Sequence, residues 1–180
     1  ENGGKFLTCS FNQFVYVYAS LRKFNKNSLI QTTNVEFAEN NKKIKHDLIR
    51  ETLKEFNIRQ NIHIGSFSTI PTKTGLGSSS SFVVGLITVL LKILNKKMTK
   101  NQIYKKAYKI EREILNNAGG WQDQIIATYG GIQKVTINKK GQIKINELKL
   151  KKQSITALEK KALLVFTDET RDSTKIINEQ

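Results

Sequence analysis

The fold of this chain is decided by the stretch Pro71-Thr72-Lys73-Thr74-Gly75-Leu76-Gly77-Ser78-Ser79-Ser80-Ser81. It separates a predicted strand, Ile62 to Phe67, from a segment, Ser78 to Asn95, whose nearly all-round hydrophobicity predicts a buried helix. Glycines let a backbone approach a ligand closely, and the first turn of a helix attracts anions. The stretch therefore predicts a phosphate-binding loop. A Gly/Ser turn that only caps a helix is the alternative, although four serines are unusual there because serine is a poor helix former.

Hydrophobic periodicity predicts further elements on both sides of this loop. Before it we expect a mostly buried strand, Phe6 to Ser20, an antiparallel partner strand, Ser28 to Phe37, and a helix, Asp47 to Phe56. After it we expect helices over 99–116, with a capping box of Thr99 and Gln102, and over 121–129, a hairpin of 132–137 and 142–148, a lysine-rich link, a buried strand over 162–167 and a helix from 173. The mixed order predicts the α+β class.

Length and composition limit the kinds of protein this chain can be. Its 180 residues, 38% of them hydrophobic, suit one domain or one domain plus part of another. No apolar run reaches the roughly 20 residues of a membrane helix, so we expect no membrane partner. A single cysteine, Cys9, excludes an internal disulfide and favours a reducing, cytoplasmic compartment. Its apolar neighbours place Cys9 in the predicted core.

The formal net charge of the chain is +15. A charge of this size is typical of proteins that bind nucleic acid or another polyanion. However, the lysines are spread along the whole chain, and arginine-rich clusters with interleaved aromatic residues are absent. We therefore favour a compositional bias over nucleic-acid binding. A positive field would also attract phosphorylated substrates.

Three acidic residues follow the loop: Glu111 and Glu113 in one predicted helix, and Asp123 after a Gly-Gly break. Phosphoryl transfer needs Mg²⁺, donors around the phosphates and a group that orients or deprotonates the acceptor hydroxyl. Glu111 adjoins the apolar stripe and can reach inward, whereas Glu113 is expected in solvent. Asp123 lies in a first helical turn, where the dipole favours its charged form. Helix glutamates are usually surface residues and such aspartates often cap helices, so these simpler roles stay open.

The pattern P-x-x-x-G-L-G-S-S-S resembles the second conserved motif of the GHMP kinases, whose loop wraps the phosphates of ATP. The run Gly119-Gly120-Trp121-Gln122-Asp123-Gln124, with Glu111 before it and Tyr129-Gly130-Gly131 after it, resembles two sugar-kinase branches, the heptose 7-phosphate kinases and the L-fucokinases. The resemblance covers nearly the entire chain. It implies a two-layer N-terminal GHMP kinase domain, of a fold shared with a ribosomal protein domain, and then the start of a ferredoxin-like C-terminal domain.

The resemblance also implies ATP and Mg²⁺ as cofactors and a role for individual residues. ATP would be held by the loop residues Pro71, Gly75, Leu76, Gly77, Ser78, Ser79 and Ser80. The Ser79 hydroxyl and Glu111 would be Mg²⁺ ligands, and Asp123 the catalytic base or the group that orients the acceptor. Trp121, Gln122 and Arg171 would contact the substrate, with core packing as the alternative for Trp121 and a salt bridge at a helix end as the alternative for Arg171.

The first and third motifs of the family are not found in the chain, so we expect a fragment of a longer protein. Residues 1–150 would form the N-terminal domain and residues 151–180 the truncated start of the C-terminal one. Half of a cleft cannot exclude water or position an acceptor, so activity of these residues alone is not assured. We expect an ATP-dependent kinase of a sugar hydroxyl, with a heptose 7-phosphate as first candidate. L-fucose, an acceptor of the mevalonate type, and a basic nucleic-acid-binding module are the alternatives. Nothing indicates the oligomeric state.

Overall fold

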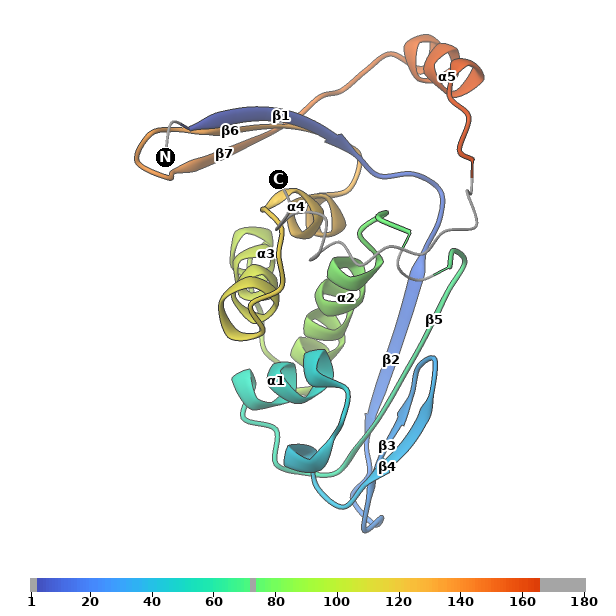
Figure 1. Cartoon of the computed structure of the whole chain (residues 1–180), viewed down its shortest axis with the longest axis vertical. Helices are drawn as coiled ribbons and strands as arrows, with labels where there is room; N and C mark the ends of the chain where they lie inside the picture. Colours follow the sequence, from blue (N-terminus) through green and yellow to red (C-terminus); the bar gives the residue numbers. More distant parts are fainter. Residues whose placement is uncertain (1–2, 72–73, 166–180) are drawn as a thin grey trace.

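A computed structural model describes residues 3–71 and 74–165, which contain two separate sheets (Figure 1). The four-stranded sheet has the order β2-β5-β3-β4, with β2 Val15–Leu21, β5 Ile62–Ser68, β3 Ser28–Gln31 and β4 Val35–Ala38. In it β3 runs parallel to β5, and the other neighbours are antiparallel. The smaller sheet is antiparallel and holds β6 Ile132–Ile137 between β1 Gly4–Cys9 and β7 Ile143–Glu147.

Five helices form a second layer on one face of the four-stranded sheet (Figure 1). They are α1 Asp47–Glu55, α2 Ser78–Ile93, α3 Lys100–Tyr108, the π-helical η2 Lys109–Ile114 and α4 Gln122–Tyr129. The short helix η1 Asn41–Lys43 precedes α1, and α5 Lys152–Lys161 lies apart from this layer. Helix α2 packs directly on β2, where a Cβ added to Gly85 would lie 3.0 Å from Cγ2 of Val17. Helices α1, α3 and α4 pack on α2, which is therefore buried on nearly all sides.

The main core lies between α2 and the four-stranded sheet. Leu86, Ile87 and Leu90 of α2 and Ile62 and Ile64 of β5 have no exposed surface. Burying one such side chain stabilises the fold by about 1.5–3 kcal/mol. Outside this core, Glu55 at the end of α1 forms ion pairs with Lys106 at 2.8 Å and with Lys109 at 3.0 Å. These ion pairs join α1 to α3 and to η2, the helix that carries Glu111.

Most elements expected around the phosphate-binding loop are confirmed. Strand β5 and helices α1, α2 and α4 match their predicted ranges to within two residues. The Thr99 hydroxyl accepts a hydrogen bond from the amide of Gln102, and Oε1 of Gln102 accepts one from the amide of Thr99, so the capping box is also confirmed. The hairpin is present as β6 and β7. The predicted helix over 99–116 changes from α-helix to π-helix at Lys109.

The prediction for the first strands was wrong. The expected strand from Phe6 to Ser20 is broken over 10–14, and its halves, β1 and β2, belong to different sheets. The expected strand over 28–37 is a hairpin of β3 and β4, and β2 pairs with β5 instead of with it. Cys9 is exposed and not in the core. Period-two alternation places side chains on two faces, but it does not identify which strand pairs with which.

The segment after the hairpin also differs from expectation. Helix α5 replaces the lysine-rich link and buries none of its residues. Residues 162–165 form no strand, and Leu163 is 87% exposed, so the described part of the predicted strand over 162–167 is neither extended in a sheet nor buried. The predicted helix from 173 lies outside the described residues. Across the described ranges, helices are too short or too polar to cross a membrane.

Candidate phosphate-binding site

The glycine-serine loop leads directly from β5 into the first turn of α2. Gly75 and Gly77 have φ angles of 74° and 71°, in the left-handed region that favours glycine. Gly77 is the N-cap residue of α2, and its carbonyl accepts a hydrogen bond of 2.9 Å from the amide of Ser81. The amides of the first turn keep no partner within the helix. This end of α2 therefore offers free backbone donors and a positive dipole end to an anion.

Glu111 points from η2 to the start of α2. The glutamate is 1% exposed, and its Oε1 accepts a hydrogen bond of 2.8 Å from Oγ of Ser79. Its Oε2 accepts one of 2.7 Å from Nε2 of Gln124, which also donates to Oγ of Ser80 at 3.0 Å. Gln124 and Ser80 are buried. The sequence predicted Glu111, Ser79 and Ser80 as site residues, and they meet in one hydrogen-bonded network.

Asp123 also lies beside the loop, in the first turn of α4. A Cβ added to Gly77 would lie 3.4 Å from Cγ of Asp123, so the carboxyl group packs against the glycine itself. Burial raises the pKa of Asp123 above its ordinary value, and the negative charge of Glu111 acts in the same direction, while Arg112 opposes both. Two carboxylates therefore flank the start of α2. This arrangement allows one to bind a metal and the other to interact with a proton.

The remaining predicted site residues lie outside the hydrogen-bonded network of Glu111 and the contact of Asp123 with Gly77. Trp121 stacks on Tyr108 with ring centroids 3.4 Å apart, as the core-packing alternative expects, and its contact with a substrate stays a prediction. Gln122 is exposed at the start of α4, Pro71 is exposed and Leu76 is half-buried. Ser78 opens α2 and is half-buried. Arg171 lies outside the described residues. Glu113 is exposed, as expected, and Lys109 pairs with Glu55.

Two site residues were missed by the sequence reasoning: Gln124 and Arg112. Gln124 joins Glu111 to Ser80, and Arg112 hydrogen-bonds the backbone before Gly119. Both are neighbours of predicted residues in the sequence, since Gln124 follows Asp123 and Arg112 follows Glu111. A polar residue one step from a candidate in a helix points about 100° away, so adjacency gave no reason to include either.

The oxygen atoms around Glu111 are of the kind that bind a magnesium ion. Mg²⁺ prefers oxygen ligands and is usually held by one or two carboxylates together with substrate phosphates. The Ser79 hydroxyl and the Glu111 carboxylate already lie 2.8 Å apart, and within the described residues Oε1 of Gln124 is buried without a hydrogen-bond partner. No group of three or more His, Cys, Asp or Glu side chains that could hold a metal occurs in the same ranges. An ion here would therefore need further oxygens from a nucleotide.

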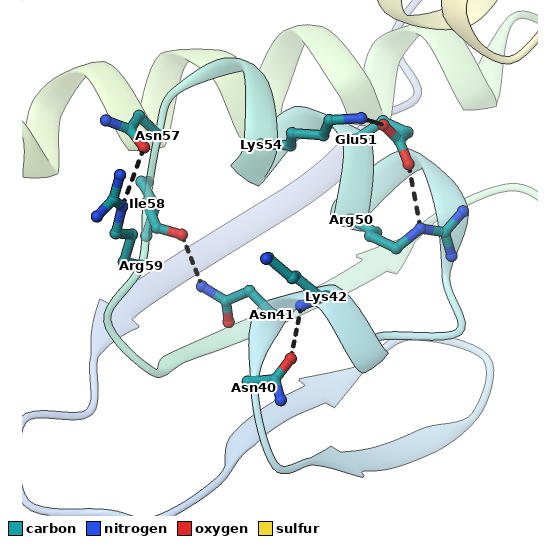
Figure 2. A pocket seen from close by; sticks show the side chains of 9 residues that line it. All are labelled: Asn40, Asn41, Lys42, Arg50, Glu51, Lys54, Asn57, Ile58 and Arg59. Carbon is teal, nitrogen blue, oxygen red and sulfur yellow. Dashed lines mark hydrogen bonds and ion pairs between the residues drawn. The ribbon is translucent and has the colours of Figure 1, made fainter.

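A separate hollow of about 960 Å³ lies beside η1 and α1. Figure 1 places these elements at the end of α2 opposite to the loop. Figure 2 shows that Arg50 and Lys54 both approach Glu51 and that Arg59 approaches Asn57, so several of its basic side chains have neutralising or polar partners. The hollow takes no part in the phosphate-binding site.

Replacing Gln124 with leucine is expected to lower the free energy of unfolding by about 3 kcal/mol, because it leaves a buried carboxylate oxygen of Glu111 without its donor. Gln133→Leu is the matched control. Gln133 is also buried, but its Nε2 donates only to the neutral carbonyl of Gly130, so the loss should be smaller. Urea denaturation of both variants measures the difference. Equal losses would show that the hydrogen bond from Gln124 to Glu111 stabilises the fold no more than one to a neutral carbonyl.

Comparison with known proteins agrees with this geometry. The family model of the GHMP kinases N terminal domain matches residues 42–131, which contain the loop, Glu111 and Asp123. The chain belongs to the GHMP kinase family. A D-glycero-alpha-D-manno-heptose 7-phosphate kinase of Campylobacter jejuni is 33% identical over 153 residues, which are 83% of this chain and 45% of that kinase. A bifunctional fucokinase/GDP-fucose pyrophosphorylase of Arabidopsis thaliana is 30% identical over 64% of this chain and 11% of its own length.

Solved structures confirm the predicted fold class. A D-glycero-D-manno-heptose 1-phosphate kinase from Bacteriodes thetaiotaomicron superposes with a TM-score of 0.79 at 22% identity, over 87% of this chain and 55% of that one. A putative sugar kinase from Campylobacter jejuni gives 0.73 at 25% identity, over 86% of this chain and 53% of its own. This chain therefore spans about half the length of the Campylobacter heptose 7-phosphate kinase and of these two solved structures, and a smaller share of the fucokinase.

Proposed function

We propose that this chain forms the ATP- and Mg²⁺-binding part of a sugar kinase that phosphorylates a hydroxyl group, with a heptose 7-phosphate as the first candidate acceptor. The observation that carries the proposal is the 2.8 Å contact between Ser79 and Glu111, with the Asp123 carboxyl group packed on Gly77. A carboxylate and a hydroxyl at the positive end of α2 suit a metal-bound triphosphate. A second carboxylate beside the same loop suits an acceptor hydroxyl.

The proposed division of roles follows from the surroundings of each group. The loop amides and Ser78 to Ser80 would hold the phosphates, and Ser79 and Glu111 the Mg²⁺ ion, which when bound neutralises charge on the transferring group. Asp123 would orient the acceptor and take its proton, since its raised pKa brings its basicity closer to the range useful for proton transfer. We propose residues 1–150 as the N-terminal domain and 151–180 as the start of the C-terminal one.

The acceptor is proposed from the relatives. The Campylobacter heptose 7-phosphate kinase matches over 83% of this chain, and the Arabidopsis fucokinase over 64%. A mevalonate kinase of Methanocaldococcus jannaschii is 36% identical, but over only 53% of the chain. The greater coverage favours a sugar phosphate, with L-fucose second and mevalonate third. Such an ATP-dependent enzyme is expected in the cytoplasm.

The proposal is tested by offering the purified full-length protein ATP, Mg²⁺ and each acceptor separately, with ADP formation and product mass as readouts. We expect turnover with D-glycero-D-manno-heptose 7-phosphate that exceeds turnover with L-fucose or mevalonate at least tenfold, which equals a barrier difference of about 1.4 kcal/mol. Binding to RNA is measured in parallel across a salt series. Tight, salt-dependent RNA binding without ATP binding would favour the nucleic-acid module instead.

A further inference from the structure

Arg112 links the helix that carries Glu111 to the turn that precedes Asp123. It lies in η2, where the amide of Leu115 donates to the carbonyl of Ile110, five residues back. Such π-turns are rare and occur mostly at functional sites. From this turn the guanidinium group reaches forward, and its Nη1 donates to the carbonyl of Ala118 at 2.6 Å and to that of Asn117 at 3.4 Å.

The guanidinium group packs tightly on the Gly-Gly turn. A Cβ added to Gly119 would lie 2.8 Å from both Cζ and Nη2 of Arg112, closer than side chains tolerate, and Gly119 has a φ of 133°. Nε of Arg112 is buried without a hydrogen-bond partner among the described residues. A buried donor that is left unpaired carries a free-energy cost. The packing of Arg112 on Gly119 therefore fixes the turn but lowers the free energy of unfolding. Such local costs are common where a strained geometry serves a function.

The turn that Arg112 holds determines where α4 begins. Trp121 is the N-cap residue of α4, and Asp123 is its second helical residue, which faces Gly77. The positive charge of Arg112 also acts on Asp123, where it favours the charged carboxylate. Among the described residues, the charged groups that act on Asp123 are Glu111 and Arg112, both in η2, and their effects are opposite.

We propose that Arg112 is a positioning residue for Asp123: it holds the Gly119–Gly120 turn in place and so fixes the start of α4, the helix that carries the carboxylate meeting the acceptor. The inference rests on the proposed kinase function and assigns to it a residue outside the phosphate loop and the metal ligands. Two consecutive residues of η2 then serve the two halves of the reaction, because Glu111 faces the metal side and Arg112 the acceptor side.

The test compares Arg112→Ala and Arg112→Lys in the full-length enzyme. We expect Arg112→Ala to lower kcat about 100-fold, the size of effect that a small misplacement of a reacting group produces. The Kd for ATP should stay within about threefold of the wild-type value, since the side-chain hydrogen bonds of Arg112 to described residues go to the turn before Gly119 and not to the phosphate loop. Arg112→Lys keeps the charge but not the two-carbonyl fork, so its kcat should lie between the two. Guanidinium ion in the millimolar range should partly restore Arg112→Ala but not Asp123→Asn.

Arg59→Ala is the matched control, because Arg59 is an exposed arginine beside α1, and its kcat should equal that of the wild type. Amide hydrogen exchange over 117–123 is read in every variant. Faster exchange in Arg112→Ala than in Arg59→Ala supports the role of Arg112 in holding the Gly119–Gly120 turn. A wild-type protein that phosphorylates no sugar would refute the proposed kinase function but would leave this role of Arg112 intact. A kcat of Arg112→Ala within threefold of wild type, or unchanged exchange, would overturn the proposal. If Arg112→Ala does not fold, Arg112→Lys decides by the same two readouts.

Discussion

Asp123→Asn in the full-length protein is expected to lower kcat by about 10³-fold, within the range that general bases contribute, while the Kd for ATP changes less than about threefold. Asparagine keeps the shape of the side chain that packs on Gly77, but it cannot accept the proton of an acceptor hydroxyl. Steady-state kinetics with the best acceptor and calorimetric titration with ATP measure the two quantities. A kcat equal to that of the wild type would remove Asp123 from the reaction.

Asp47→Asn is the matched control for this substitution. Asp47 is also an aspartate in a first helical turn, but it is an exposed residue of α1 and is not one of the site residues, so its loss should leave kcat unchanged. Stability provides a second readout. Folding raises the pKa of Asp123, so its contribution to the free energy of unfolding falls as pH rises from below its unfolded pKa to above its folded one. Asp123→Asn removes this penalty and should be no less stable than the wild type at pH 7.

Glu111→Gln is expected to have the other large effect, a fall in kcat of about 10³-fold, because a metal ion contributes several kcal/mol to stabilising transferred charge. The Mg²⁺ concentration for half-maximal turnover should also rise by more than about tenfold, since even partners outside the inner shell change metal affinity by 10- to 100-fold. Glutamine retains the size of the side chain that fits between Ser79 and Gln124. A Mg²⁺ titration of turnover checks both expectations.

Glu113→Gln is the control for Glu111→Gln, since it changes the same residue type in the same π-turn at an exposed position. Its Mg²⁺ dependence should match that of the wild type. Mn²⁺ binding, followed by paramagnetic broadening in the presence of ADP, gives a readout that is independent of turnover. If Glu111→Gln kept its Mn²⁺ affinity and lost only stability, Glu111 would be a buried structural residue and not a metal ligand.

Much of the fold could be predicted because its strongest signals are local. The all-round apolar run of α2, the capping box at Thr99 and the turn between β6 and β7 each depend on residues close together in the chain. The pairing of β2 with β5 was missed, because Val15 and Ser68 face each other across more than fifty residues. Alternating strands specify their two faces but not their neighbours.

The candidate site was predictable where a residue type matched a chemical task. The glycines with positive φ and the two carboxylates near them were identified for that reason. Gln124 and Arg112 were missed because their roles consist of contacts to other site residues, which only the three-dimensional arrangement reveals. The sequence allowed two roles for Trp121, contact with a substrate and packing in the core. The stacking of Trp121 on Tyr108 is what the packing role expects.

The pairing of β1 with β6 has a consequence for how the chain acquires its structure. Gly4 lies opposite Ile137 and Cys9 opposite Ile132. During synthesis, β1 therefore has to remain without its partner until β6, more than 120 residues later in the chain, has been made, and the pairing of the two strands should be among the slower folding steps. A ribosome-stalled chain that ends before β6 would expose β1 to proteases and chaperones, while β2, β5 and α2 could already be assembled.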